Sequence, residues 1–258
     1  MTQNEQSYHG NPNLKSIGYQ HDFTKWEFEE FVKCENDPIY FIENFCKIVT
    51  LDNGLQPFVL YECQKRKVEF ITTNRKTILM EGRQQGKTVT AAACILHYSI
   101  FNADKTIAIM ANKTAAAREV LSRYQTMYEN LPVWMQQGVK TWNKGDVDLE
   151  NGSRVFTSAT TSSGIRGKSV NWLYIDEAAI IPNNVADDFF ASVYPTISAG
   201  ETTKILLTST PLGYNHFWKF WNESEKGTNG LRTCSFRTPK SQAAMLIGPK
   251  NNLTCWVR

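Results

Sequence analysis

The chain has 258 residues, a hydrophobic content of 41% and a formal net charge of +3 at pH 7. These values predict one large globular domain with a real core, and leave room for a small second one. No stretch approaches the roughly 20 apolar residues that cross a bilayer, and the polar residues 1–13 lack the apolar core of a signal peptide. Six scattered cysteines without a Cys-x-x-Cys pair indicate small core residues in a reducing compartment. The modest charge does not by itself indicate a nucleic-acid-binding protein.

The first part of the chain predicts a flexible segment followed by helices. Residues 1–22 are expected to be flexible. Thr24 and Glu27 fit a capping box that begins a helix, and Asp37 followed by proline begins a second one. With the helix that follows them, these elements predict a helical cap over about residues 23–73.

A third helix is predicted over residues 61–73. It carries Gln64 and the basic residues 65–67. Basic triplets on helices are more often solvated faces than DNA sites, so we interpret this one as a solvated face.

Residues 77–88 combine an apolar run, a loop and a Gly-Lys-Thr step into a segment that favours a helix. Loops of this kind surround a triphosphate with backbone N–H groups, and the helix adds its partly positive N-terminus. Lys87 would then reach the β and γ phosphates, and the hydroxyl of Thr88 would bind Mg²⁺. The other loop residues expected to bind the nucleotide are Gly82, Gln84, Gln85 and Gly86.

The loop departs by one position from the strict phosphate-loop pattern, which requires a glycine four residues before the Gly-Lys-Thr. Glu81 occupies that position, and Gly82 follows it. The alternative interpretation is an ordinary strand-to-helix turn with an exposed lysine. The order of strand, loop and apolar helix favours the phosphate loop.

A second apolar run, residues 172–175, ends at Asp176 and Glu177. Two adjacent acids after a buried strand can both face the crevice in which open α/β sheets bind ligands. Asp176 would complete a Mg²⁺ site opposite Thr88, and Glu177 would orient and deprotonate an attacking water. The alternative is a helix cap, in which Asp176 caps the turn that follows.

A third strand candidate, residues 204–207, leads into Thr208, Ser209 and Thr210. These hydroxyls could sense a γ phosphate or simply begin a turn, and the residues alone favour the turn.

Strands alternating with helices along the rest of the chain predict the fold class. Residues 106–110 favour a strand, 113–130 a helix, 146–157 a hairpin and 214–221 an aromatic-rich helix. The pattern predicts an α/β protein of the P-loop NTPase class. It would have a mostly parallel sheet flanked by helices, the N-terminal helical cap and an inserted β-hairpin. Residues 228–258 show no clear pattern.

Motifs in consistent order resemble the ATPase part of the terminase large subunit of tailed phages, of the myovirus type. They lie at residues 10–15, 82–88, 142–145, 151–153, 174–177, 208–211 and 215–217. The family loop has Ser or Gly before Arg-Gln-x-Gly-Lys-Thr, so the position of Gly82 is similar to the family form. The resemblance implies an enzyme that hydrolyses ATP with Mg²⁺ to translocate double-stranded DNA into an empty procapsid.

The resemblance also implies roles for individual residues. Gln64 matches the glutamine that reads adenine, and Arg83 matches a loop arginine that acts on the γ phosphate in the manner of an arginine finger. The two acids match the metal-binding and catalytic acids of the family. Residues 208–210 match the motif that couples hydrolysis to movement, which replaces the turn interpretation. Arg166 lies in a family-like Arg-Gly step, with a plain surface arginine as the alternative.

By the same resemblance, the expected partners are double-stranded DNA, the procapsid portal, the terminase small subunit and further copies in a ring. The expected location is the cytoplasm of the infected bacterial host, and transiently the portal. No membrane partner is expected.

The expected domains are an ATPase domain over residues 23–225 and a partial lid or atypical tail over 226–258. Since residues 238–258 contain no acidic residue, no carboxylate-based nuclease centre is expected there. Two other functions stay open: a helicase-like translocase, and a truncated module that binds nucleotide without cycling.

Overall fold

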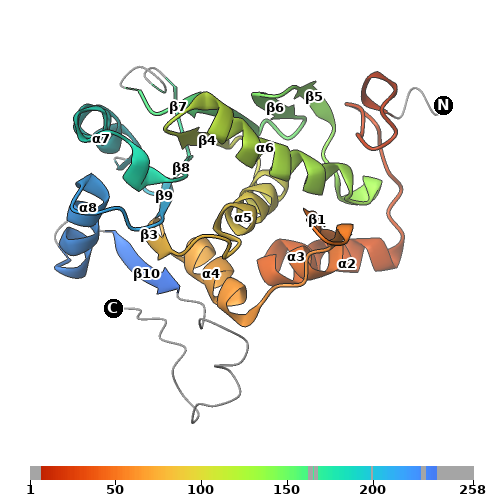
Figure 1. Cartoon of the computed structure of the whole chain (residues 1–258). Coiled ribbons are helices and arrows are strands. Elements are labelled where there is room, and N and C mark those ends of the chain that lie inside the picture. The colour runs from red at the N-terminus through yellow and green to blue at the C-terminus, as the bar shows by residue number, and fades with distance from the viewer. Residues whose placement is uncertain (1–6, 162–164, 166–167, 199, 228–230, 237–258) are drawn as a thin grey trace, which may run out of the picture.

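The computed structural model describes residues 7–161, 165, 168–198, 200–227 and 231–236. This part of the chain forms an α/β fold around an eight-stranded sheet (Figure 1). Across the sheet, the strands are β10 (Arg232–Phe236), β3 (Lys76–Glu81), β9 (Lys204–Ser209), β8 (Trp172–Ile175), β4 (Thr106–Ala111), β7 (Arg154–Ala159), β6 (Asp146–Leu149) and β5 (Val139–Trp142). The first six strands are parallel to one another. At the far edge, β6 pairs antiparallel with β7, and β5 pairs antiparallel with β6.

Helices cover both faces of the sheet (Figure 1). One face is covered by α2 (Lys25–Asn36), α3 (Pro38–Phe45), α4 (Glu62–Thr73), α5 (Lys87–Phe101) and α6 (Thr114–Glu129). The other face is covered by α7 (Asn183–Ser198), α8 (His216–Glu225) and the short 3₁₀ turn η3 (Ala178–Ile180). In the described ranges, no helix has both the length and the apolar character needed to cross a membrane.

The strands contribute side chains to two separate hydrophobic cores, because successive side chains of a strand point to opposite faces of the sheet. Leu79 and Tyr174 are buried against the helices of the first face, whereas Ile78 and Leu173 are buried against those of the second. Strands buried on both faces read as continuous apolar runs, which is how the sequence presents them.

The predicted helix starts are confirmed by their capping contacts. Oγ1 of Thr24 accepts a hydrogen bond from the backbone N of Glu27 (3.2 Å), and the Glu27 carboxylate accepts one from the backbone N of Thr24 (2.8 Å). Oδ1 of Asp37 accepts hydrogen bonds from two backbone N–H groups in the first turn of α3, both at 3.0 Å. The helices of residues 25–73 pack into the same core as α5, so they are continuous with the main fold.

The predicted hairpin over residues 146–157 is present as β6 and β7, with Asn151 and Gly152 in its turn. It is part of the main sheet, since β7 also pairs in parallel with β4. Further elements escaped the sequence patterns: the hairpin of β1 (Lys47–Thr50) and β2 (Gly54–Pro57), and also β5, α7 and β10. The short strands among these have too few residues to show a periodic pattern, so whether they form depends on the strands with which they pair.

Within the segment expected to be flexible, residues 1–22, Leu14 and Lys15 contact the main fold. After the 3₁₀ turn η1 (Tyr8–Gly10), Leu14 is 2% exposed in the main core. The backbone N of Lys15 donates to Oε1 of Gln136 (3.0 Å), and its carbonyl accepts from the backbone N of Val139 (2.9 Å). Gln136 follows the 3₁₀ turn η2 (Val133–Met135), and Val139 is the first residue of β5. These two hydrogen bonds therefore hold Lys15 beside the start of β5. A single buried leucine in a polar stretch is too weak a signal to predict this contact.

Candidate functional site

The predicted loop, the two acids and the three hydroxyls lie at the carboxyl ends of three adjacent parallel strands. β9 lies between β3 and β8 in the sheet. The loop after β3, the acids after β8 and the hydroxyls at the end of β9 are therefore neighbours in space. Open α/β sheets bind ligands at this edge.

Residues 82–86 connect β3 to α5 in a tight loop. Gln84 and Gly86 have left-handed backbone conformations, with φ values of 59° and 71°. Glycine suits the second position because L side chains rarely adopt this φ, and a Cβ there would also lie 2.4 Å from Nε2, the flexible end of Gln64. Glycine-containing loops that turn into a helix N-terminus are typical anion-binding sites.

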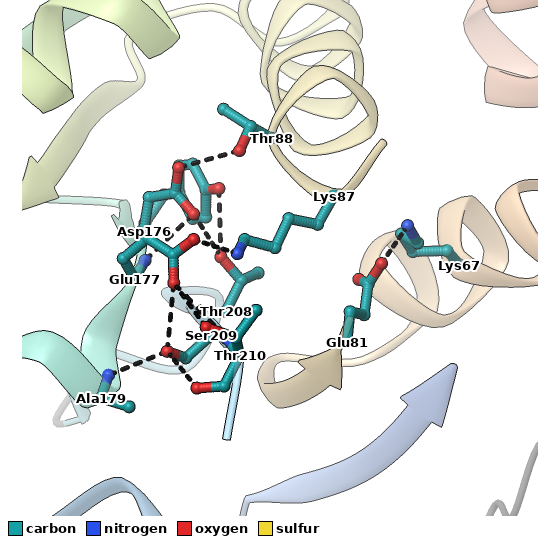
Figure 2. Close-up of polar contacts among 11 residues, drawn as sticks. Lys67, Glu81, Lys87, Thr88, Asp176, Glu177, Ala179, Thr208, Ser209 and Thr210 are labelled. Carbon is teal, nitrogen blue, oxygen red and sulfur yellow. Dashed lines mark hydrogen bonds and ion pairs between the residues drawn. The ribbon is translucent and has the colours of Figure 1, made fainter. Parts of the chain in front are cut away.

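Lys87 and Thr88 are the first two residues of α5, and both face the acids after β8 (Figure 2). Lys87 is 8% exposed, and its Nζ makes an ion pair with Oε1 of Glu177. Oγ1 of Thr88 donates a hydrogen bond to Oδ2 of Asp176 over 2.9 Å. The structure thus joins the two halves of the predicted site by direct contacts.

The two acids differ in their surroundings. Asp176 is 7% exposed, and its Oδ1 accepts hydrogen bonds from Oγ1 of Thr208 (2.9 Å) and from the backbone N of Glu177 (3.0 Å). The side chain of Glu177 is 35% exposed. Its backbone has a φ of 50°, a conformation that costs a non-glycine residue about 1–3 kcal/mol and is found preferentially at functional sites.

The hydroxyls at the end of β9 bind both acids. Thr208 contacts Asp176, while the hydroxyls of Ser209 and Thr210 each donate to Oε2 of Glu177 over 3.4 Å. The buried hydroxyl of Tyr174 lies 3.2 Å from Oγ1 of Thr208 and extends the network into the core. Every member of the predicted coupling segment therefore touches an acid.

The turn after Glu177 is held by two residues at the start of α8. Nδ2 of Asn215 donates to the carbonyl of Ala179 (2.9 Å), and Nε2 of His216 donates to the carbonyl of Ala178 (2.8 Å). Burial lowers the pKa of His216, so the ring is neutral at neutral pH. These contacts connect the acids to α8 and fix the turn in which Glu177 sits.

An open cavity of about 380 Å³ lies in front of the loop. Its lining comprises residues 82–89, Arg123 and Glu177. Arg123, an exposed residue of α6, was missed by the sequence analysis. Only the packing of α6 against α5 brings it to the cavity, and no local pattern marks it.

The remaining predicted residues take different positions. Arg83 is exposed and lines the cavity. Gln64 is 5% exposed and is not among the lining residues; its Oε1 accepts a hydrogen bond from the backbone N of Tyr61 (2.9 Å). Arg166 lies outside the described residues.

The donor set at the acids fits one divalent cation with hard oxygen ligands. In the described part of the chain, no three His, Cys, Asp or Glu side chains cluster as a metal site. Thr88 and Asp176 nevertheless present a hydroxyl and a carboxylate that already touch. Mg²⁺ commonly binds through one or two such groups and completes its shell with waters and substrate phosphates, so this pair suits Mg²⁺.

Comparison with protein families gives a match for this chain. A model of the family described as "Terminase large subunit, T4likevirus-type, N-terminal" matches residues 78–240, which is more than half of the chain.

Three solved structures share the fold. The large terminase of bacteriophage HK97 is 19% identical, with a TM-score of 0.64, over 80% of this chain and 44% of that one. The large terminase ATPase domain of Thermus phage P74-26 is 21% identical, with a TM-score of 0.52, over 63% of this chain and 69% of that one. The large terminase of a thermophilic bacteriophage, in complex with ATP-γ-S, is 13% identical, with a TM-score of 0.53, over 74% of this chain and 47% of that one. The chain thus matches less than half the length of the first and third of these proteins.

Proposed function

Since the chain belongs to the T4-like type of terminase large subunits, we propose that it hydrolyses ATP with Mg²⁺ to drive double-stranded DNA into a viral procapsid. The matched part of that family is its N-terminal part, and this membership implies a role in DNA packaging. The observation that carries the proposal is the convergence of Lys87 and Thr88 with Asp176 and Glu177 beside one open cavity.

ATP would lie with its triphosphate along residues 82–88. The backbone of this loop, the N-terminus of α5 and Lys87 supply positive charge for the phosphates. The related thermophilic-phage structure with ATP-γ-S supports a nucleotide in this fold. Arg83 lines the cavity and would add charge at the γ phosphate, and Gln64 would have to leave its contact with Tyr61 to read the base.

Thr88 and Asp176 would hold Mg²⁺, which neutralises charge that develops on the phosphates during the reaction. Glu177 would orient a water and accept its proton as the water oxygen bonds to the γ phosphorus. The bond from that phosphorus to the β–γ bridging oxygen breaks in the same step, and ADP and phosphate leave.

The ion pair between Lys87 and Glu177 links binding to chemistry. In this ion pair, Lys87 occupies Oε1 of Glu177. Phosphates that attract Lys87 would free the carboxylate for water, so hydrolysis begins only once the nucleotide is bound. The hydroxyls of Ser209 and Thr210 on Glu177 would then report the change to β9 and α8, in keeping with a coupling role.

The remaining elements of the proposal follow from family membership. The partners would be double-stranded DNA, the procapsid portal, the terminase small subunit and neighbouring copies in a ring, in the cytoplasm of an infected bacterium.

The primary test is ATP hydrolysis by the full chain with and without Mg²⁺. Lys87→Ala should weaken ATP binding by about 10- to 100-fold, because it removes a charged hydrogen-bond donor to the phosphates. Lys25→Ala, on the exposed part of α2, is the control and should behave as the unmodified protein. Equal ATP binding by Lys87→Ala and the unmodified chain would refute the proposed site.

Two assays separate the alternative functions. Strand separation by the purified chain would support the helicase-like translocase. ATP binding without hydrolysis, even with DNA and procapsids present, would support the module that binds nucleotide without cycling.

A further inference from the structure

A second lysine–glutamate pair, Lys67 and Glu81, lies apart from the pair of Lys87 and Glu177 (Figure 2). Nζ of Lys67, on α4, is 2.5 Å from Oε2 of Glu81, the last residue of β3. Their side chains are 1% and 0% exposed. The sequence suggested a solvated face for residues 65–67, and for Lys67 the structure shows the opposite.

Burying this pair is unfavourable by itself. Removing two charges from water costs more than their attraction commonly returns, and an apolar pair of similar size often serves stability equally well. Burial raises the pKa of Glu81, and its Oε1 has no hydrogen-bond partner among the described residues. A contribution to folding stability therefore does not account for the pair.

The contacts of the pair point instead to the loop. Nζ of Lys67 also donates to the carbonyl of Gln85 over 3.3 Å. Lys67 thus contacts the residue before the loop, Glu81, and the residue just before Gly86. One turn earlier on α4, the amide of Gln64 lies against Gly86. The same helix therefore braces the loop at both of its ends.

We propose that Lys67 and Glu81 are positioning residues for ATP, which hold the backbone of residues 82–86 in the curvature that receives the triphosphate. Neither residue is among those that line the cavity. The inference rests on the proposed function, and its effect would be exerted through the loop backbone. A loop held in its bound shape before ATP arrives loses less conformational freedom on binding, so its loosening should weaken ATP affinity.

The double variant Lys67→Met/Glu81→Leu separates positioning from stability. Replacing both charges by apolar side chains of similar length leaves no unpaired buried charge, so the fold should survive. It also removes the hydrogen bond to the Gln85 carbonyl and frees the loop. We expect a melting temperature close to that of the unmodified protein, and an affinity for fluorescent ATP that is lower by about 10-fold or more.

Three single variants complete the design, of which Glu81→Gln removes only the charge of the buried carboxylate. Lys67→Arg keeps a charged hydrogen-bond donor, so its ATP affinity should lie close to that of the unmodified chain and above that of the double variant. Lys65→Met is the matched control, since Lys65 lies on the same helix but pairs with Glu43 at 2.9 Å, away from the loop, and ATP affinity should not change. In steady-state assays KM for ATP should rise more than kcat falls, because Glu177 and Asp176 are untouched.

Each outcome of these measurements supports or overturns the positioning role of Lys67 and Glu81. A double variant that is folded and binds ATP as tightly as the unmodified chain overturns the proposal, and so does a double variant that fails to fold together with a Glu81→Gln variant that binds normally. Folded variants with weakened binding and recovery by Lys67→Arg support it. If the unmodified chain itself fails to bind or hydrolyse ATP, the proposed function fails first, independently of the variants.

Discussion

Two lysine–glutamate pairs flank the same loop, and they differ in burial rather than in chemistry. The side chains of Lys67 and Glu81 are 1% and 0% exposed, whereas those of Lys87 and Glu177 are 8% and 35% exposed. The first pair joins α4 to the end of β3. The second joins the start of α5 to the residue after β8, at the edge of the open cavity.

The difference in burial suggests different tasks. A fully buried pair cannot exchange partners without exposing a charge to a low-dielectric interior, so it is suited to fixing a backbone. A pair at the cavity edge can exchange partners, since water and a charged ligand can take the place of either member. We therefore regard Lys67–Glu81 as permanent and Lys87–Glu177 as a contact that ATP opens.

The largest effect is expected for Glu177→Gln. Loss of the general base should lower turnover by about 10²- to 10⁴-fold. ATP binding should be kept or improved, because Lys87 no longer has a competing carboxylate. Phosphate release and fluorescent-ATP binding measure the two quantities, and preserved turnover would remove Glu177 from the base role.

The next largest effect contrasts the stability of two variants. Lys67→Met leaves Glu81 as an unpaired buried charge and should lower the free energy of unfolding by about 3–5 kcal/mol. Lys87→Met leaves Glu177 partly hydrated, so its cost should stay below about 1 kcal/mol. Urea unfolding of both variants measures the difference. Equal losses would show that the two pairs do not differ in the way described.

A smaller effect is expected on the pH dependence of ATP affinity. Burial raises the pKa of Glu81 above its ordinary value of 4.5, so acidification protonates it before ordinary carboxylates. The attraction to Lys67 is then lost, and affinity should fall as the pH is lowered into the range in which Glu81 takes up its proton. The Glu81→Gln variant gives the baseline, since ATP itself also titrates. Identical pH profiles for both proteins would contradict the prediction.

The smallest effect is expected at an exposed ion pair. Arg154 on β7 pairs with Asp146 and Asp148 on β6. Arg154→Gln should change the free energy of unfolding by less than about 1 kcal/mol and leave ATP hydrolysis unaltered, because water screens such pairs. Thermal unfolding provides the check, and a large loss would mean that exposure is a poor guide to the value of ion pairs in this protein.

The site was predictable where residues of a distinctive type follow one another. The Gly-Lys-Thr step and the two acids after an apolar strand are local signals, and the structure brings them into contact. The phosphate loop needs a glycine before its lysine for backbone reasons, and strand ends need no long-range information to be recognised. The capping contacts of Thr24 and Asp37 were predictable for the same reason.

The sequence by itself therefore determined the fold class, the loop, the two acids and the strands and helices with clear patterns, but not β1, β2, β5, α7 or β10. Tertiary structure alone decided that Lys67 is buried, that Arg123 reaches the cavity, that Leu14 anchors the N-terminal segment, and that β10 pairs with β3. The physical reason is that burial and strand pairing depend on partners far away in the chain. A lysine on a helix has the same local pattern whether its neighbour in space is water or a glutamate at the end of a strand.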